Sequence, residues 1–175
     1  KITGDGLNAF IPEGESEGKS ALFFLACTPE GRQLLKDYAG LRDKITKDGL
    51  NAVIPEGKDK GKSPLVYLAA NVEGRQLLTS NPELLGKITA QGLNAVIAEG
   101  EHKGISALFS FAGNPDGRQL LKDYAGLRGK ITVDGLNNVI TEGAGKGKSA
   151  LFFLAADTEG PVSYTHLTLP TTCLV

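Results

Sequence analysis

Residues 44–57 read Lys44-Ile45-Thr46-Lys47-Asp48-Gly49-Leu50-Asn51-Ala52-Val53-Ile54-Pro55-Glu56-Gly57, and near-copies of this stretch begin at Lys1, Lys87 and Lys130. The four copies start 43 residues apart. A fixed period of roughly 20 to 50 residues is typical of stacked repeat arrays, in which each unit contacts mainly its neighbours. We therefore divide the chain into three repeats at 1–43, 44–86 and 87–129, a truncated fourth repeat at 130–160 and a tail at 161–175.

The tail departs abruptly from the repeat pattern. After Gly160 the chain continues as residues 161–171, which read Pro-Val-Ser-Tyr-Thr-His-Leu-Thr-Leu-Pro-Thr, where the other copies continue Arg-Gln-Leu-Leu after the equivalent glycine. This string resembles a translated sequencing adapter of the kind that contaminates metagenomic gene predictions. The alternative is a divergent terminal cap, but Pro161 falls where a helix is expected. We expect the tail to be non-native, and, because the chain lacks Met and starts at a repeat position, we expect a fragment of a longer array.

The overall charge and composition exclude several classes of partner. The formal net charge is −1, from 19 basic and 20 acidic residues, so no attraction to nucleic acid or to an anionic membrane is expected. No apolar run approaches the roughly 20 residues of a membrane-spanning helix. A single native cysteine, Cys27, indicates a packed thiol and no disulfide framework. Low cysteine use and the lack of a leader favour a cytoplasmic location, with a secreted effector as the alternative.

Each copy opens with a connector whose local structure the sequence leaves open. Leu50, Val53 and Ile54 have helical spacing, which is consistent with a short helical turn. Residues 52–54 are equally consistent with an extended segment. In either case the residues Pro-Glu-Gly at 55–57 end it.

A variable tip follows, held between two conserved glycines. In the second repeat Gly57 and Gly61 bracket Lys58, Asp59 and Lys60, and the bracketed residues change sign of charge between copies. This pattern predicts an exposed loop, which we call a finger.

Two helices follow each finger. Ser20, Ser63, Ser106 and Ser149 precede apolar runs and are good N-caps, and Pro64 stands at the first helical position, which tolerates proline. The run after each serine is apolar nearly all round, as expected for an inner helix packed on both sides. Residues of preferred N-cap types introduce a second helix at four equivalent positions, namely Thr28, Asn71, Asn114 and Asp157. In the second repeat Asn81-Pro82 should end that helix, and a further helical turn should lead to Lys87.

These two helices carry a family resemblance. The segment Gly61-Lys62-Ser63-Pro64-Leu65-Val66-Tyr67-Leu68-Ala69 resembles the opening of an ankyrin repeat, and residues 73–78 resemble its second helix with the terminal leucine pair. The resemblance covers about half of each unit and implies a mainly α solenoid of stacked helix-turn-helix repeats that binds other proteins. The period of 43 exceeds the usual ankyrin period of about 33 and also suits armadillo or HEAT repeats of roughly 40–47 residues. The array looks like a long-period, bacterial-type ankyrin-like variant.

Residues 57–63, His102 and a set of recurring arginines are the candidates for a chemical role. Residues 57–63 resemble a phosphate-binding loop, but the spacer is one residue short and Glu56 replaces the first glycine. His102 is the single native histidine, and no His, Cys and carboxylate cluster has metal-ligand spacing. Arg32, Arg75 and Arg118 recur, which is typical of a solvated or salt-bridging face, although a row of guanidinium groups could also grip an acidic partner.

The sequence therefore predicts a scaffold that binds another protein through positions that vary between copies, without catalysis, cofactor or metal of its own. No nucleic acid, membrane or small-molecule substrate is expected. The alternatives are a targeting region of a larger enzyme or effector whose catalytic domain lies elsewhere and, more remotely, a nucleotide site at residues 57–63. The candidate contact residues are Glu15, Ser16, Glu17, Lys58, Asp59, Lys60, Glu101, His102, Lys103 and Lys146 on the fingers, and Phe24, Tyr67, Ser110 and Phe153 on the first helices.

Overall fold

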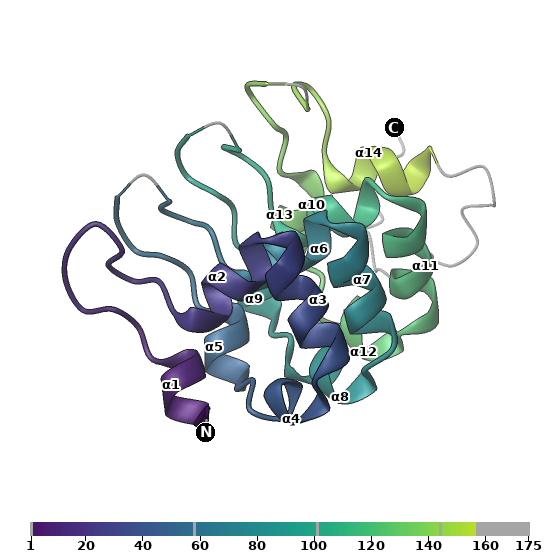
Figure 1. The fold of residues 1–175 in the computed structure, drawn as a ribbon. Helices are drawn as coiled ribbons and strands as arrows, with labels where there is room; N and C mark the ends of the chain where they lie inside the picture. Colours follow the sequence, from purple (N-terminus) through teal and green to yellow (C-terminus); the bar gives the residue numbers. More distant parts are fainter. Residues whose placement is uncertain (1, 58, 101, 144, 157–175) are drawn as a thin grey trace, which may run out of the picture.

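The protein is mainly helical. The computed structural model describes residues 2–57, 59–100, 102–143 and 145–156, and within these ranges it contains helices and loops but no strand (Figure 1). Both the tail at 161–175 and the predicted N-cap Asp157 lie outside the described residues.

Each of the first three repeats contains four helices, and the described part of the fourth contains two. The leading helices are short, and they are α1 (Gly4–Asn8), α5 (Lys47–Asn51), α9 (Ala90–Asn94) and α13 (Val133–Asn137). The first helices follow the fingers, and they are α2 (Ala21–Cys27), α6 (Pro64–Ala70), α10 (Ala107–Ala112) and α14 (Ala150–Ala155). The second helices are α3 (Pro29–Asp37), α7 (Val72–Thr79) and α11 (Pro115–Asp123). The closing helices are α4 (Ala39–Arg42), α8 (Pro82–Lys87) and α12 (Ala125–Arg128).

The predicted starts of the first helices are confirmed. The Ser63 hydroxyl accepts a hydrogen bond from the backbone N–H of Val66, and Pro64 is the first helical residue. The same serine cap opens α2, α10 and α14. Each cap satisfies a backbone N–H that has no partner within its own helix.

The second helices also begin where the sequence predicts, but their caps differ. Thr28 accepts a hydrogen bond from the N–H of Gly31 in the expected way. Asn71 and Asn114 stand at the N-cap, yet their side-chain amides donate instead to the carbonyls of Tyr67 and Ser110. An asparagine carries both donors and acceptors, so it closes the end of the preceding helix as readily as it caps the next.

The connector is part helix and part extended segment. Thr46 caps α5, and the helix stops at Asn51 because Ala52 already has extended backbone angles. Residues 52–54 are outside the helix, so the helical interpretation is wrong for Val53 and Ile54. The predicted end of α7 before Pro82, and the extra turn α8 after it, are both present.

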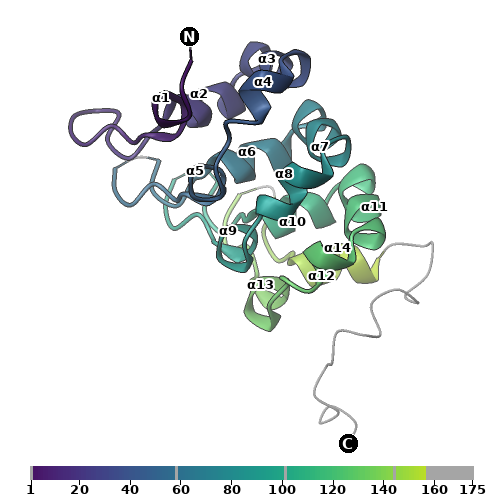
Figure 2. The same ribbon diagram turned by 90° about the horizontal axis from the view of Figure 1, so that it is seen from below.

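Equivalent helices of successive repeats pack against one another. First helix α6 contacts both α2 and α10, and α10 contacts α14; second helix α7 likewise contacts α3 and α11. Figures 1 and 2 show the repeats side by side, with the fingers on one flank and the second helices on the other. The packing of α6 explains why Leu65, Val66 and Leu68 are buried, as predicted for an inner apolar helix.

One hydrophobic core runs through all the repeats. Its members recur at the same repeat positions, so leucines at equivalent places in different repeats are buried together. Examples are Leu7, Leu50, Leu93 and Leu136 from the leading helices. Each repeat thus buries its apolar side chains against its neighbours as well as within itself.

An asparagine at the end of each of the first three leading helices joins one repeat to the next. The Asn51 amide donates to the carbonyl of Lys87 at 2.8 Å, and its Oδ1 accepts from the N–H of Thr89 at 2.9 Å. Asn8 makes the same two bonds to Lys44 and Thr46, and Asn94 makes them to Lys130 and Thr132. This series, the asparagine ladder, fixes the spacing between repeats through hydrogen bonds to backbone atoms.

Candidate functional site

The four fingers share one backbone design. In the second repeat the N–H of Ile54 donates to the carbonyl of Lys62, and the N–H of Gly61 donates back to the carbonyl of Ile54, both at 2.9 Å. Equivalent pairs close the other fingers, joining Ile11 with Lys19 and Gly18, Ile97 with Ile105 and Gly104, and Ile140 with Lys148 and Gly147. The bracketing glycines have positive φ, for example 76° at Gly57 and 85° at Gly61, a conformation that other residues rarely adopt. The predicted glycine-flanked finger is therefore present.

Ion pairs link neighbouring fingers. Lys60 lies 3.2 Å from Glu99 of the next repeat, and Lys103 lies 3.0 Å from Glu142. Both pairs are exposed, so each contributes little to stability, but together they hold the fingers in register. These pairs are not among the predictions from the sequence, although a lysine 39 residues before each of these glutamates is a signal for them.

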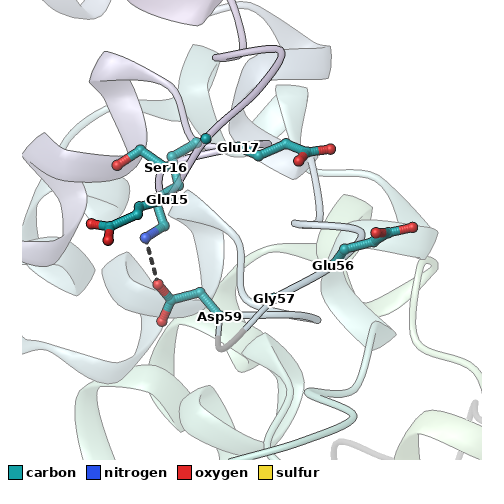
Figure 3. A pocket seen from close by; sticks show the side chains of 8 residues that line it. Glu15, Ser16, Glu17, Glu56, Gly57 and Asp59 are labelled. Carbon is teal, nitrogen blue, oxygen red and sulfur yellow. Dashed lines mark ion pairs between the residues drawn. The ribbon is translucent and has the colours of Figure 1, made fainter.

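The first junction lacks this ion pair. Glu17 occupies the position of Lys60 and Lys103, while Glu56 occupies the position of Glu99 and Glu142. A cavity of about 590 Å³ lies between these two fingers, lined by residues that include Glu15, Glu17, Glu56 and Asp59. In Figure 3 the carboxylates of Glu17 and Glu56 lie on one side of the cavity and that of Glu15 on the other. This junction is therefore distinctly acidic.

Asp59 lies below this cavity in a polar cluster between the first two repeats. Its carboxylate contacts Lys19 and Lys62, each at 2.7 Å. Burial alone would raise the pKa of Asp59, but the hydrogen bonds from Lys19 and Lys62 outweigh it, so the pKa of the carboxyl group is lowered. Burial likewise acts to lower the pKa of Lys62, and the bond to Asp59 reverses the direction and raises it.

Cys27 and Tyr67 extend the cluster inward. Burial raises the pKa of the Cys27 thiol to about 11, although a hydrogen bond with Tyr67 opposes the rise. Burial is also the main reason that the pKa of Tyr67 is raised. A neutral thiol is a poor nucleophile, so the arrangement supports a packed cysteine rather than a reactive one.

The structure separates the predicted contact residues on the fingers into two groups. Glu15, Glu17, His102 and Lys146 are exposed, and Ser16 is partly buried. Asp59, Lys60 and Lys103 are engaged in the ion pairs that join fingers, so their side chains have a structural role as well. Lys58 and Glu101 lie outside the described residues.

The predicted contact residues on the first helices differ in exposure. Phe24 is 45% exposed, and Ser110 is only 6% exposed, so Ser110 offers little surface to a partner. Tyr67 and Phe153 are partly buried, and each packs edge to face on a phenylalanine of the preceding repeat, with ring centroids 5.4 Å apart. These aromatic pairs continue the repeat packing at the base of the fingers.

The recurring arginines do not form an accessible row. Arg75 is 6% exposed, and its Nη1 atom donates to the carbonyls of Ala69 and Ala70 at the end of α6. Its Nε atom donates to Asp116 of the next repeat at 2.7 Å. Arg32 makes the equivalent bonds to Ala26 and Cys27 and lies 3.4 Å from Glu73. The salt-bridging interpretation therefore holds for these two arginines, which are too buried to grip an acidic partner.

Residues 57–63 resemble a phosphate-binding loop in sequence but not in the hydrogen bonds of their backbone. The N–H groups of Lys60, Gly61 and Lys62 all donate to carbonyls of the same finger. The Lys62 ammonium pairs with Asp59, and the Ser63 hydroxyl caps α6. The groups that cradle phosphate in a true loop are thus already committed here.

Searches for other chemistry give few further features. Across the described residues no group of His, Cys, Asp and Glu is arranged to hold a metal ion. In the same part of the chain, no helix has the length and apolar character required to cross a bilayer. Comparison with family models, curated proteins and solved structures finds no match.

Proposed function

We propose that the chain is a stack of ankyrin-like repeats that binds another protein through its fingers and the adjoining surface of the first helices. The observation that carries this proposal is the distribution of variation. Residues that are constant between copies, such as Asn51 and Arg75, hold the repeats together through backbone bonds. Residues that vary, such as Glu15, His102 and Lys146, are exposed on the fingers. A scaffold that is constant inside and variable along one edge is suited to recognition.

The finger supports the ankyrin-like over the armadillo- or HEAT-like alternative. The connector helix α5 has only five residues, and hydrogen bonds of Ile54 with Lys62 and Gly61 close a loop after it. In each complete repeat the two longest helices form the helix-turn-helix pair that the family resemblance implies, and the leading and closing helices are shorter.

The charge along the fingers indicates the kind of partner. The first junction is acidic, with Glu15, Glu17 and Glu56 around one cavity. The last described finger carries Lys146 and Lys148. A polypeptide with a basic segment over the first fingers and an acidic segment over the last would complement this edge.

The proposal can be tested by selecting binders from a displayed peptide library against the full chain. Selected peptides should lose about tenfold or more in affinity for a chain with Glu15→Ser, Glu17→Ser, His102→Ser and Lys146→Ser, because a few central contacts carry most binding energy. A chain with Asp43→Ser and Glu83→Ser, changed on the closing-helix side, is the matched control and should retain affinity. Peptides that bind all three chains equally would show that the fingers are not the binding surface.

A further inference from the structure

The first repeat exposes apolar side chains that the later repeats bury. Ile2 is 59% exposed, Ile11 is 38% exposed and Leu34 is 44% exposed. The residues at equivalent positions are 0–3% exposed where a preceding repeat covers them, namely Ile45 and Ile88, Ile54, Ile97 and Ile140, and Leu77 and Leu120. Ile131, equivalent to Ile2, is partly buried. The residue types and the local backbone structure are the same in each copy, so the presence or absence of a preceding repeat determines how exposed these side chains are.

Ile2 and Leu34 border a groove on the outward side of the first repeat. The groove has a volume of about 710 Å³ and is lined by residues that include Ile2, Leu25, Leu34, Tyr38 and Leu41. Burying this surface would remove apolar area from water, which is the main driving force for association.

The same face presents the backbone groups that the asparagine ladder uses. At each internal junction an asparagine of the preceding repeat accepts from a threonine N–H, as Asn8 does from Thr46. Thr3 is the equivalent threonine of the first repeat. A β-carbon on Gly49 would come within 2.8 Å of the Asn8 Cγ atom, whereas the nearest atom to one on Gly6 is the hydroxyl of Thr3, at 3.1 Å. The face is therefore open where an asparagine lies at other junctions.

The face also carries the matching charges. Internal junctions pair an arginine with Glu73 or Asp116 and a finger lysine with Glu99 or Glu142. The equivalent residues of the first repeat are Glu30 and Glu13, which are exposed. These two carboxylates thus occupy positions whose equivalents at the internal junctions pair with an arginine and a lysine of the preceding unit.

From these features we propose that this face docks one further repeat unit of the same kind, which presents an asparagine, an arginine and a finger lysine. A second copy of this chain is a poorer fit. Its fourth repeat offers Asn137 and Lys146, but it has Pro161 at the position of Arg118. A complete unit supplies all three groups, so the occupant is a complete unit.

The test is a fusion of a second copy of residues 44–86 to the start of the full chain, so that its terminal glycine precedes Lys1 as Gly86 precedes Lys87. The fused chain should unfold in one transition, at a higher urea midpoint than the unfused chain. The backbone amide hydrogen of Thr3 should exchange at least about tenfold more slowly, because a side-chain oxygen now accepts its hydrogen bond. A second, independently melting transition with unchanged Thr3 exchange would overturn the proposal.

Two variants of the fusion make the test specific. Asn51→Ala within the added unit should abolish the protection of Thr3. Glu30→Arg should lower the urea midpoint of the fusion more than that of the unfused chain, because the new guanidinium would face Arg75 of the added unit. If the unfused chain instead dimerises and Thr3 becomes protected in the dimer, a second copy covers the face and the proposal is wrong.

Discussion

The side-chain amide of Asn51 occupies the space directly over Gly92, so that a β-carbon on Gly92 would lie 2.7 Å from the Asn51 Cγ atom. Gly92 belongs to the leading helix of the next repeat, and its lack of a side chain lets Asn51 reach the backbone of Lys87 and Thr89. The recurring Gly-Leu-Asn triplet is thus two halves of one contact. The glycine of one repeat receives the asparagine of the repeat before it.

Gly92→Ala should destabilise the protein by about 1–3 kcal/mol, because the new methyl group overpacks the junction. Asn51→Ala should cost a similar amount, about 1–3 kcal/mol, since it leaves backbone groups of the next repeat without partners. Urea denaturation followed by circular dichroism measures both. Gly86→Ala is the matched control, because no atom lies within 4 Å of its β-carbon, and it should be neutral or slightly stabilising. Equal losses in Gly92→Ala and Gly86→Ala would contradict the contact.

Arg75→Gln should lower the free energy of unfolding by about 2–4 kcal/mol, because the carbonyls of Ala69 and Ala70 lose a buried charged donor. Asp116→Asn removes only the half-exposed partner across the junction and should cost less than about 1 kcal/mol. Comparing the two urea midpoints separates the capping role from the ion pair. Equal losses of stability would instead show that the ion pair with Asp116 contributes more than the bonds to the carbonyls of Ala69 and Ala70.

Stability should fall in acid partly because Asp59 becomes protonated. Its pKa is lowered in the folded state by Lys19 and Lys62, so its contribution is present above the unfolded-state pKa, near 3.8, and is lost as the pH falls through the folded-state value. Urea midpoints measured from neutral pH down into this range should converge for the wild type and Asp59→Asn. Asp43→Asn, which removes an exposed carboxylate, should not reproduce that convergence.

Alkylation should show that Cys27 is protected by the fold. With a pKa of about 11 instead of the ordinary 9.0, its thiolate fraction near pH 8 is lower by about 100-fold. In a Cys173→Ser background, iodoacetamide should therefore react much more slowly with the folded chain than with the chain in urea, as followed by mass spectrometry. Because the folded state disfavours the thiolate, the stability that this group confers should decline above about pH 9. Equal rates with and without urea would contradict the assignment.

Glu17→Lys should complete the series of ion pairs between fingers. The new lysine would face Glu56 as Lys60 faces Glu99, which removes one carboxylate from an acidic junction. The expected gain is small, up to about 1 kcal/mol at low salt, and it should shrink as salt is added. Glu15→Lys makes the same change of charge two residues away and should gain less. A larger gain in Glu15→Lys would place the favourable contact elsewhere.

The sequence by itself determined the local structure. Four copies of one pattern showed that Ser63 and its equivalents begin helices and that Gly57 and Gly61 bracket a finger, and Asn81-Pro82 in the second repeat showed where one helix ends. Each of these features depends on capping, on proline geometry or on positive φ, which are properties of a few neighbouring residues.

Only the tertiary structure decided what the constant polar residues do. Asn51, Arg75 and Lys60 act on partners roughly 40 residues away, and a single sequence does not show which atoms meet across that distance. It was also the tertiary structure that buried Ser110 and showed Ile2 exposed while its copies Ile45 and Ile88 are buried. Identical residues differ in exposure because the exposure of a side chain depends on whether a neighbouring repeat covers it.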